Sequence, residues 1–448
     1  MKRFKGVVAI LLGIGLALFA AACSSKDGGT NGDMAGAVSS NAAGASASAS
    51  ASGSAKEPEK DVKLRIAWWG SQSRHDATIR ALDAYTEKHP KITFEPEYAG
   101  FDAYFDKLAT VAAARNAPDV IQMDIAYLKQ YVENGQLLEL TGVDTSHINP
   151  GLLESGMLDG KLYAIPLGDN VKGMAYNKVM VDKIGIKPPS DGWTWEDYFQ
   201  FGRDAKAKLG ADVYPLVDST NSNSLYNMYQ VSHGKGDVVS SDGHFNLDRD
   251  TFLEFQSTFV QLRKEGVVPP AELSVTHKKF DPQNDLMAKG VMLIQDIYAA
   301  QATSVDSMNP GNFALVTIPK GVQKGGWITP SMFWSISANS EHAEQGQQFI
   351  DWFVNDLDAG KILGTSRGIP VSSVVLDGLL PDMKDADKMA LDLLEVGSVD
   401  APLIPTNPGR WNGWLEKDYV TVTEKLMFGK TTPEEAYDEL VKLAKQYQ

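Results

Sequence analysis

The chain has 448 residues, of which 43% are hydrophobic and 22% charged, and its formal net charge is −15. This is the composition of a soluble globular protein, and the length suggests more than one domain. An acidic surface repels phosphate backbones and no basic run offsets it, so a nucleic-acid-binding role is excluded. A single cysteine excludes an internal disulfide.

The first residues have the pattern of an export signal. A positively charged start, an apolar run over residues 6–19 and three alanines precede Cys23. A cysteine in this place resembles the lipobox of bacterial lipoproteins, which implies that residues 1–22 are removed and that Cys23 carries the lipid. We therefore expect a protein anchored by lipid to the outer face of the bacterial cell membrane. The alternative is a plain secreted protein with an incidental cysteine.

The following segment, 23–60, is rich in Ser, Ala and Gly. It has almost nothing to bury, so it cannot offset the entropy of ordering. As a flexible coil it would span roughly 35 Å, which suits a tether between a membrane and a folded domain.

From residue 62 onward, predicted strands and helices alternate. Residues 62–69 (VKLRIAWW) indicate a strand, residues 75–88 a helix stopped by a proline, and 91–98 a second strand. Apolar spacing over 104–111 predicts another helix, and 118–123 a short buried strand. This alternation predicts an α/β fold with largely parallel sheets.

Several short segments together form a recognisable series along the chain. The segments are 66–70, 117–121, 159–166, 174–178, 193–198, 288–292 and 367–371. Their order resembles that of the family 1 extracellular solute-binding proteins, the carbohydrate-binding subunits of bacterial ABC importers, a family that includes maltose-binding protein. The resemblance extends from residue 62 to the C-terminus.

The resemblance implies the type II periplasmic-binding-protein fold, in which two α/β lobes surround a ligand cleft and are joined by three hinge crossovers. Each expected crossover has Gly or Pro nearby, which suits backbone that must turn or flex. Hinge closure around the ligand is the expected motion. We expect crossovers near 168–172, 327–332 and 366–370, an N-terminal lobe of 61–168 plus 332–367, and a C-terminal lobe of 172–328 plus 370–448.

A sugar site needs flat aromatic rings and planar polar groups that pair with hydroxyls. Trp411 lies in a loop rich in Pro and Gly, and the resemblance implies that it stacks on sugar, with Trp414 beside it. The resemblance also places Tyr298 at a stacking position. Trp327, at a crossover, and Tyr226 are further aromatic candidates, whereas Trp334 is expected in the core.

Polar candidates follow predicted strands or lie at the crossovers. Strand ends in open α/β sheets face the ligand crevice. Three of the candidates have an alternative role. Arg74 could pair with an acidic neighbour, and Asp124 could cap the next helix. Arg367 could clasp the hinge. The predicted polar and strand-end ligand contacts are Gln72, Arg74, Met123, Asp124, Asp169, Asn170, Asn221 and Arg367.

Motifs for catalysis or metal binding lack their required context. Residues 364–368 match G-x-S-x-G, but a helix, not a strand, is expected before them. Residues 246–250 resemble a calcium loop without its turn glycine and better suit a helix cap. Thr194 and Asp197 fit a capping box. We expect no catalytic residue, no metal and no cofactor.

The sequence therefore predicts a monomeric binding protein that captures a mono- or oligosaccharide and delivers it to the transmembrane subunits of an ABC permease. Two alternatives stay open. One is a secreted carbohydrate-active hydrolase that uses the same aromatic residues to position a glycan. The other keeps the fold but binds a peptide or a polyamine.

Overall fold

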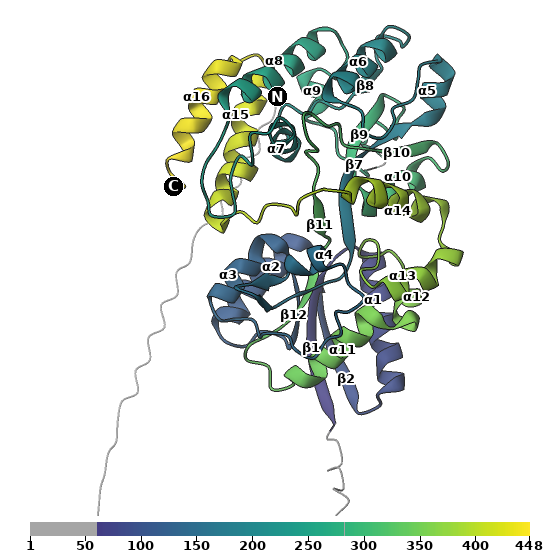
Figure 1. Ribbon diagram of the computed structural model, residues 1–448, viewed down its shortest axis with the longest axis vertical. Helices are drawn as coiled ribbons and strands as arrows, with labels where there is room; N and C mark the ends of the chain where they lie inside the picture. Colours follow the sequence, from purple (N-terminus) through teal and green to yellow (C-terminus); the bar gives the residue numbers. More distant parts are fainter. Residues whose placement is uncertain (1–60, 282) are drawn as a thin grey trace, which may run out of the picture. The chain divides into compact units, whose positions relative to one another are not determined.

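A computed structural model of the chain describes residues 61–281 and 283–448 (Figure 1). The predicted signal, the predicted lipidation site Cys23 and the predicted tether lie outside the described residues. Within the described part of the chain, no helix combines the length and the apolar character that crossing a membrane requires.

The first lobe is built on a five-stranded sheet with the order β2-β1-β3-β12-β6. β1 pairs in parallel with both β2 and β3, whereas β12 is antiparallel to β3 and β6. β1 matches the predicted strand in both bounds, because its apolar residues enter a buried sheet. The bounds are β1 Val62–Trp69, β2 Ile92–Ala99, β3 Val120–Met123, β6 Ile165–Pro166 and β12 Phe333–Ile336.

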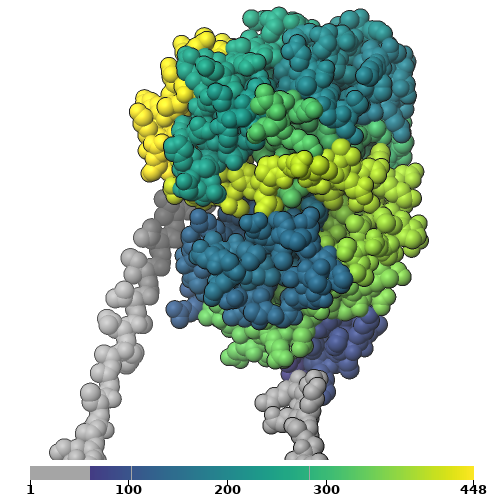
Figure 2. Space-filling model, viewed as in Figure 1, coloured from purple at the N-terminus to yellow at the C-terminus, as the bar shows by residue number. Residues whose placement is uncertain are grey.

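Helices from two separate stretches of the chain, 72–154 and 343–379, complete the first lobe, and Figures 1 and 2 show green residues beyond 330 lying against the purple and blue N-terminal ones. The core includes the fully buried Trp68 and, as expected, Trp334. A small hairpin of β4 (Met157–Leu158) and β5 (Lys161–Leu162) adds to it. The helices are α1 Gln72–Lys88, α2 Phe101–Ala113, α3 Ile125–Glu133, α4 Pro150–Glu154, α11 Ala343–Asn355, α12 Leu357–Leu363 and, packed on α12, α13 Ser373–Leu379.

The second lobe contains a sheet with the order β10-β7-β9-β8, and β11 also pairs with β7. Only β8 and β9 are parallel here; β7 is antiparallel to β9, β10 and β11. The prediction of largely parallel sheets is therefore wrong, because strands reached through crossovers enter each sheet reversed. The bounds are β7 Asp169–Asn177, β8 Tyr214–Leu216, β9 Met292–Tyr298, β10 Phe313–Thr317 and β11 Ile328–Pro330.

The helices of the second lobe follow their local signals. Thr194 and Asp197 form the predicted capping box, and Asp248 caps α8 as expected. The helices are α5 Lys178–Ile184, α6 Trp195–Lys206, α7 Asn223–Ser232, α8 Arg249–Lys264, α9 Ala271–Ser274, α10 Ala302–Met308, α14 Asp385–Ser398, α15 Tyr419–Met427 and α16 Pro433–Ala444.

The three segments that connect the two sheets are hydrogen-bonded to one another. Ser331 N donates to Gly168 O at 2.9 Å, and Asp169 and Ile369 exchange backbone bonds of 2.7 and 3.2 Å. The Ser331 hydroxyl also donates to Arg367 O. Backbone pairing thus joins the three segments into one narrow hinge region. The exact lobe boundaries remain a prediction.

Glycine is required at two positions of this hinge. A Cβ on Gly168 would lie 1.9 Å from Arg367 O, far inside van der Waals contact. Gly368 has a φ of +102°, which L side chains rarely adopt. Both glycines allow the first and third connecting segments to approach each other closely.

Candidate functional site

The carboxyl ends of β1 and β3 lie at one edge of the first sheet, because these strands are parallel. β6 ends and β12 begins at the same edge, so the hinge segments also lie there. Ligands of open α/β sheets bind outside the carboxyl ends of the strands. This edge is where the first lobe presents its candidate ligand contacts.

Two predicted contacts lie in the first turn of α1. Gln72 is exposed, and its amide nitrogen donates to Asp76 at 2.8 Å. Arg74 is partly buried, with Nε 3.1 Å from Ser366 O and Nη1 3.4 Å from Trp69 O. Burial lowers the pKa of Arg74 to about 10, so it stays positively charged at neutral pH.

Arg367 enters the first lobe from the third hinge segment and is only 3% exposed. Its Nη2 donates to Thr78 Oγ1 at 2.8 Å, and its guanidinium lies 5.6 Å from the ring of Trp334 and 5.1 Å from that of Phe353. Burial, and then the charge of Arg74, lower the pKa of Arg367 well below its usual value. These contacts attach the third hinge segment to the first lobe, and the ligand-contact and hinge-clasp roles both remain predictions.

The predicted contacts at the end of β3 have structural roles. Met123 is fully buried in the core of the first lobe, so its prediction as a ligand contact is wrong: its side chain points into the lobe. Asp124 caps α3 by accepting from Ala126 N at 2.9 Å, which is the alternative role weighed for it. Burial raises the pKa of Asp124.

Asp169 and Asn170 lie at the start of β7, next to the hinge. The Asn170 Oδ1 accepts from Val171 N and from Ala300 N at 3.1 and 3.0 Å, so this buried amide holds backbone in place. The carboxylate of Asp169 accepts from Asn170 N at 2.8 Å. Burial raises the pKa of Asp169 to about 6.

A buried charge cluster that the sequence reasoning missed lies at the hinge end of the second sheet. Lys172 and Lys279 both pair with Asp296, the former at 3.0 Å. Burial opposes the charge on Asp296, yet the two ammonium groups outweigh it and lower its pKa. The sequence signal that could have revealed this cluster is a charged residue inside each of two apolar strands, Lys172 in β7 and Asp296 in β9.

Tyr298 and Asn221 remain candidate contacts near this cluster. Lys172 Nζ lies 5.1 Å from the centre of the Tyr298 ring and 2.8 Å from Ser224 Oγ. The Tyr298 ring is partly exposed, so one cation–π contact leaves it available to a ligand. Asn221 lines a polar cavity of about 230 Å³, together with Lys279.

The predictions for Trp411 and Trp414 as sugar-stacking residues are wrong in this structure. Both are 0% exposed within the aromatic core of the second lobe. The Trp411 ring lies parallel to Phe245, with a centroid distance of 5.4 Å, and stacks on Tyr447 at 5.9 Å. Trp414 donates to Leu440 O at 3.0 Å. The Pro- and Gly-rich loop packs inward because these rings are better covered by protein than left in water.

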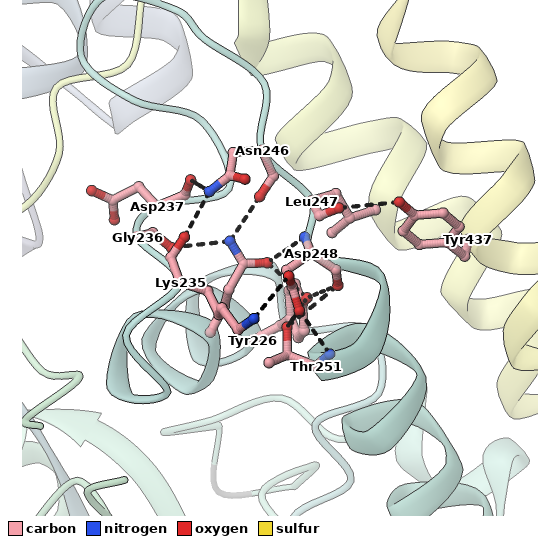
Figure 3. A network of polar contacts seen from close by, with 10 residues as sticks. Tyr226, Lys235, Gly236, Asp237, Asn246, Leu247, Asp248, Thr251 and Tyr437 are labelled. Atoms are coloured by element: carbon pink, nitrogen blue, oxygen red, sulfur yellow. Dashed lines mark hydrogen bonds and ion pairs between the residues drawn. The ribbon is translucent and has the colours of Figure 1, made fainter. Parts of the chain in front are cut away.

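Tyr226 and Trp327 are also buried, at 0% and 4% exposed, so their predictions as ligand contacts are wrong. In Figure 3 the Tyr226 hydroxyl points into a network of polar side chains around the start of α8. It lies 3.3 Å from both Asp248 O and Thr251 Oγ1. Its role is to hold α7 against α8.

The G-x-S-x-G match lacks the strand that a nucleophile elbow requires. α12, not a strand, precedes the G-x-S-x-G match, so the nucleophile-elbow reading fails as expected. Within residues 61–281 and 283–448, no group of three or more His, Cys, Asp or Glu side chains could hold a metal ion.

Residues 80–390 match the family model described as "Bacterial extracellular solute-binding protein". A lactose-binding protein of Rhizobium radiobacter is 24% identical over 301 residues, which is 64% of this chain and 69% of that protein. A multiple sugar-binding protein of Streptococcus mutans is 24% identical over 321 residues, 65% of this chain and 71% of that protein.

A solved structure has the same fold. It is a family 1 extracellular solute-binding protein from Alicyclobacillus acidocaldarius, 28% identical, with a TM-score of 0.73, and the match covers 88% of this chain and all of that one. The predicted fold class, with two α/β lobes and hinge crossovers, is confirmed.

Proposed function

Because the chain belongs to the bacterial extracellular solute-binding proteins, we propose that it captures a mono- or oligosaccharide and delivers it to the permease of an ABC importer. The observation that carries this proposal is the family match over residues 80–390, joined by relatives named for lactose and for multiple sugars. The family match supports the capture of a solute, and the names of the relatives suggest that this solute is a sugar.

The geometry of the hinge is compatible with this role. Three short segments connect the lobes, and their mutual backbone bonds concentrate bending in one place. A ligand that contacts both lobes only in the closed form would shift the population towards closure. Gln72 and Arg74 from the first lobe and Tyr298 and Asn221 from the second are the proposed contacts.

The lipid anchor on Cys23 is part of the proposal and rests on the sequence pattern before it. Cells expressing the full chain are labelled with an alkyne palmitate analogue, and the Cys23→Ser chain serves as the control. Label on the native chain alone supports the anchor. A native chain without label, released into the medium, would indicate plain secretion.

A saccharide panel tests the main proposal, using the chain from residue 61 onward and calorimetry on neutral and charged mono-, di- and oligosaccharides. We expect one-to-one binding without turnover. At about 100 times its dissociation constant, a bound sugar adds roughly 2.7 kcal/mol of stability, so melting temperature offers a rapid first screen. Binding of a peptide or polyamine in place of every saccharide would contradict the proposal.

The competing hydrolase function predicts a different result in the same samples. A hydrolase would release reducing ends from an oligosaccharide over time. We expect the sugar recovered from the complex to be unchanged after prolonged incubation.

A further inference from the structure

Arg367 is a buried cation without a counter-charge. It is 3% exposed, and its Nε and Nη1 have no hydrogen-bond partner among the described residues. Its contacts are the hydroxyl of Thr78, the distant amide oxygen of Gln122 at 3.5 Å, and two aromatic rings. Aromatic faces offset only part of the cost of burying a guanidinium.

A second unpaired guanidinium lies beside it. Thr78 Oγ1 accepts from Arg367 and donates to Arg74 O at 2.6 Å, while Arg74 Nε donates to Ser366 O. Neither arginine is ion-paired within the described part of the chain. Burial, followed by the charge of Arg74, also lowers the pKa of the neighbouring His75. Two positively charged guanidinium groups therefore lie in the same partly desolvated region around Thr78.

The rest of the molecule makes this arrangement unusual. The chain has 57 acidic and 42 basic side chains, so carboxylates are in excess. Among the described residues Lys172 is the other deeply buried lysine or arginine, and Asp296 matches its charge; the partly buried Arg263 pairs with Asp218 at 2.7 Å. Since like charges repel strongly where water is partly excluded, an unpaired arginine pair costs stability unless an anion joins it.

Arg74 is placed where a ligand can reach it. Arg74 lies in the first turn of α1, directly after the carboxyl end of β1, at the edge that presents the candidate contacts. The neighbouring Ser71, Gln72 and Ser73 are exposed. Ser71 is the N-cap residue but makes no side-chain cap bond, and a helix N-terminus itself favours negative charge.

We infer that the captured sugar is anionic, with a carboxylate or a phosphate bound against Arg74 in the first turn of α1 and Arg367 adding a second positive charge from the core behind it. This inference rests on the proposed function and narrows its ligand to acidic saccharides. Arg74 touches the anion, whereas Arg367 is a positioning residue that acts through the Thr78 contact and through its charge.

Matched saccharides that differ in charge test the inference by calorimetry. The pairs are galacturonic acid and its methyl ester, digalacturonic acid and its dimethyl ester, and galactose 6-phosphate and galactose. We expect the charged member of at least one pair to bind tenfold or more tightly than its neutral partner, and this advantage to shrink at high salt. The first two pairs report on a carboxylate and the third on a phosphate.

Variants then assign the preference to these side chains. Arg74→Gln is expected to weaken binding of the charged sugar at least tenfold and to remove its advantage over the neutral one, while Arg74→Lys retains part of it. Arg203→Gln, which breaks an exposed pair with Glu265, is the matched control and leaves the preference intact. Arg367→Met is expected to reduce the preference as well; if it does not fold, Arg74→Gln decides alone.

The outcomes separate the inference from the proposed function. Equal or tighter binding of neutral sugars overturns the anionic ligand and leaves sugar capture standing. A charge preference that survives Arg74→Gln also overturns the inference. If no saccharide, neutral or charged, binds the native chain, the proposed function fails and this inference fails with it.

Discussion

The two lobes differ in whether their buried cations have a carboxylate partner. In the second lobe, Asp296 holds two lysines, and Asp218 pairs with Arg263. In the first lobe, Arg74 and Arg367 have no carboxylate partner among the described residues. Removing one partner of a buried ion pair is costly because it leaves an uncompensated charge, and the arginines of the first lobe are already in that uncompensated state.

The largest expected effect comes from breaking the matched cluster. Asp296→Ala leaves Lys172 and Lys279 buried without their counter-charge, so we expect a loss of about 3–5 kcal/mol in the free energy of unfolding. Urea unfolding monitored by circular dichroism measures it. Asp358→Ala, which removes an exposed carboxylate paired with Lys88 on the surface, is the control and should lose far less stability. Equal losses in both variants would contradict a structural role for the cluster.

Trp411→Ala tests whether the aromatic residues of the second lobe are core or ligand contacts. Because the ring is fully buried against Phe245 and Tyr447, we expect the variant to lose about 3 kcal/mol of stability. The sugar affinity of the folded fraction should change little. A large drop in affinity with an unchanged melting temperature would instead restore the stacking role.

Asp169 lies at the hinge, between the lobe with paired buried charges and the lobe with unpaired arginines. Its pKa is about 6 in the folded chain and near 4 in the unfolded one, so folding takes up a proton between these values. Below pH 4 the carboxyl is protonated in both states, so its burial costs no stability. As the pH rises through 6, the free energy of unfolding falls by at most about 2–3 kcal/mol, because the buried carboxylate must then carry a charge. Asp169→Asn should raise the melting temperature at pH 7.5 and leave it unchanged at pH 4. An effect that does not depend on pH would contradict the assignment.

The smallest stability change is expected for Arg367→Met in the first lobe. Removing an unpaired buried charge offsets the lost contacts to Thr78 and Gln122, so we expect stability to stay within about 1 kcal/mol of the native chain. Thermal unfolding without ligand measures this change. A loss as large as that of Asp296→Ala would show that Arg367 stabilises the fold. The two lobes would then not differ in the role of their buried cations.

Local signals in the sequence were sufficient for much of the fold. The strand 62–69 was predicted with its bounds, and Thr194–Asp197 and Asp248 cap the helices they were expected to cap. These features depend on residues close in sequence: apolar runs between turns and side chains that reach backbone N–H groups three residues away. The ordered series of family segments then supplied the two-lobe fold.

Tertiary structure decided which side chains reach the site. A Pro- and Gly-rich loop gave no local reason for burial, yet Trp411 is enclosed by Phe245 and Tyr447, more than 150 and 30 residues away in the chain. The absence of a carboxylate beside Arg74 and Arg367, within the described residues, also depends on which distant segments meet. The sequence determined the elements and the family, while burial and charge pairing follow only from packing, because both depend on contacts between residues far apart along the chain.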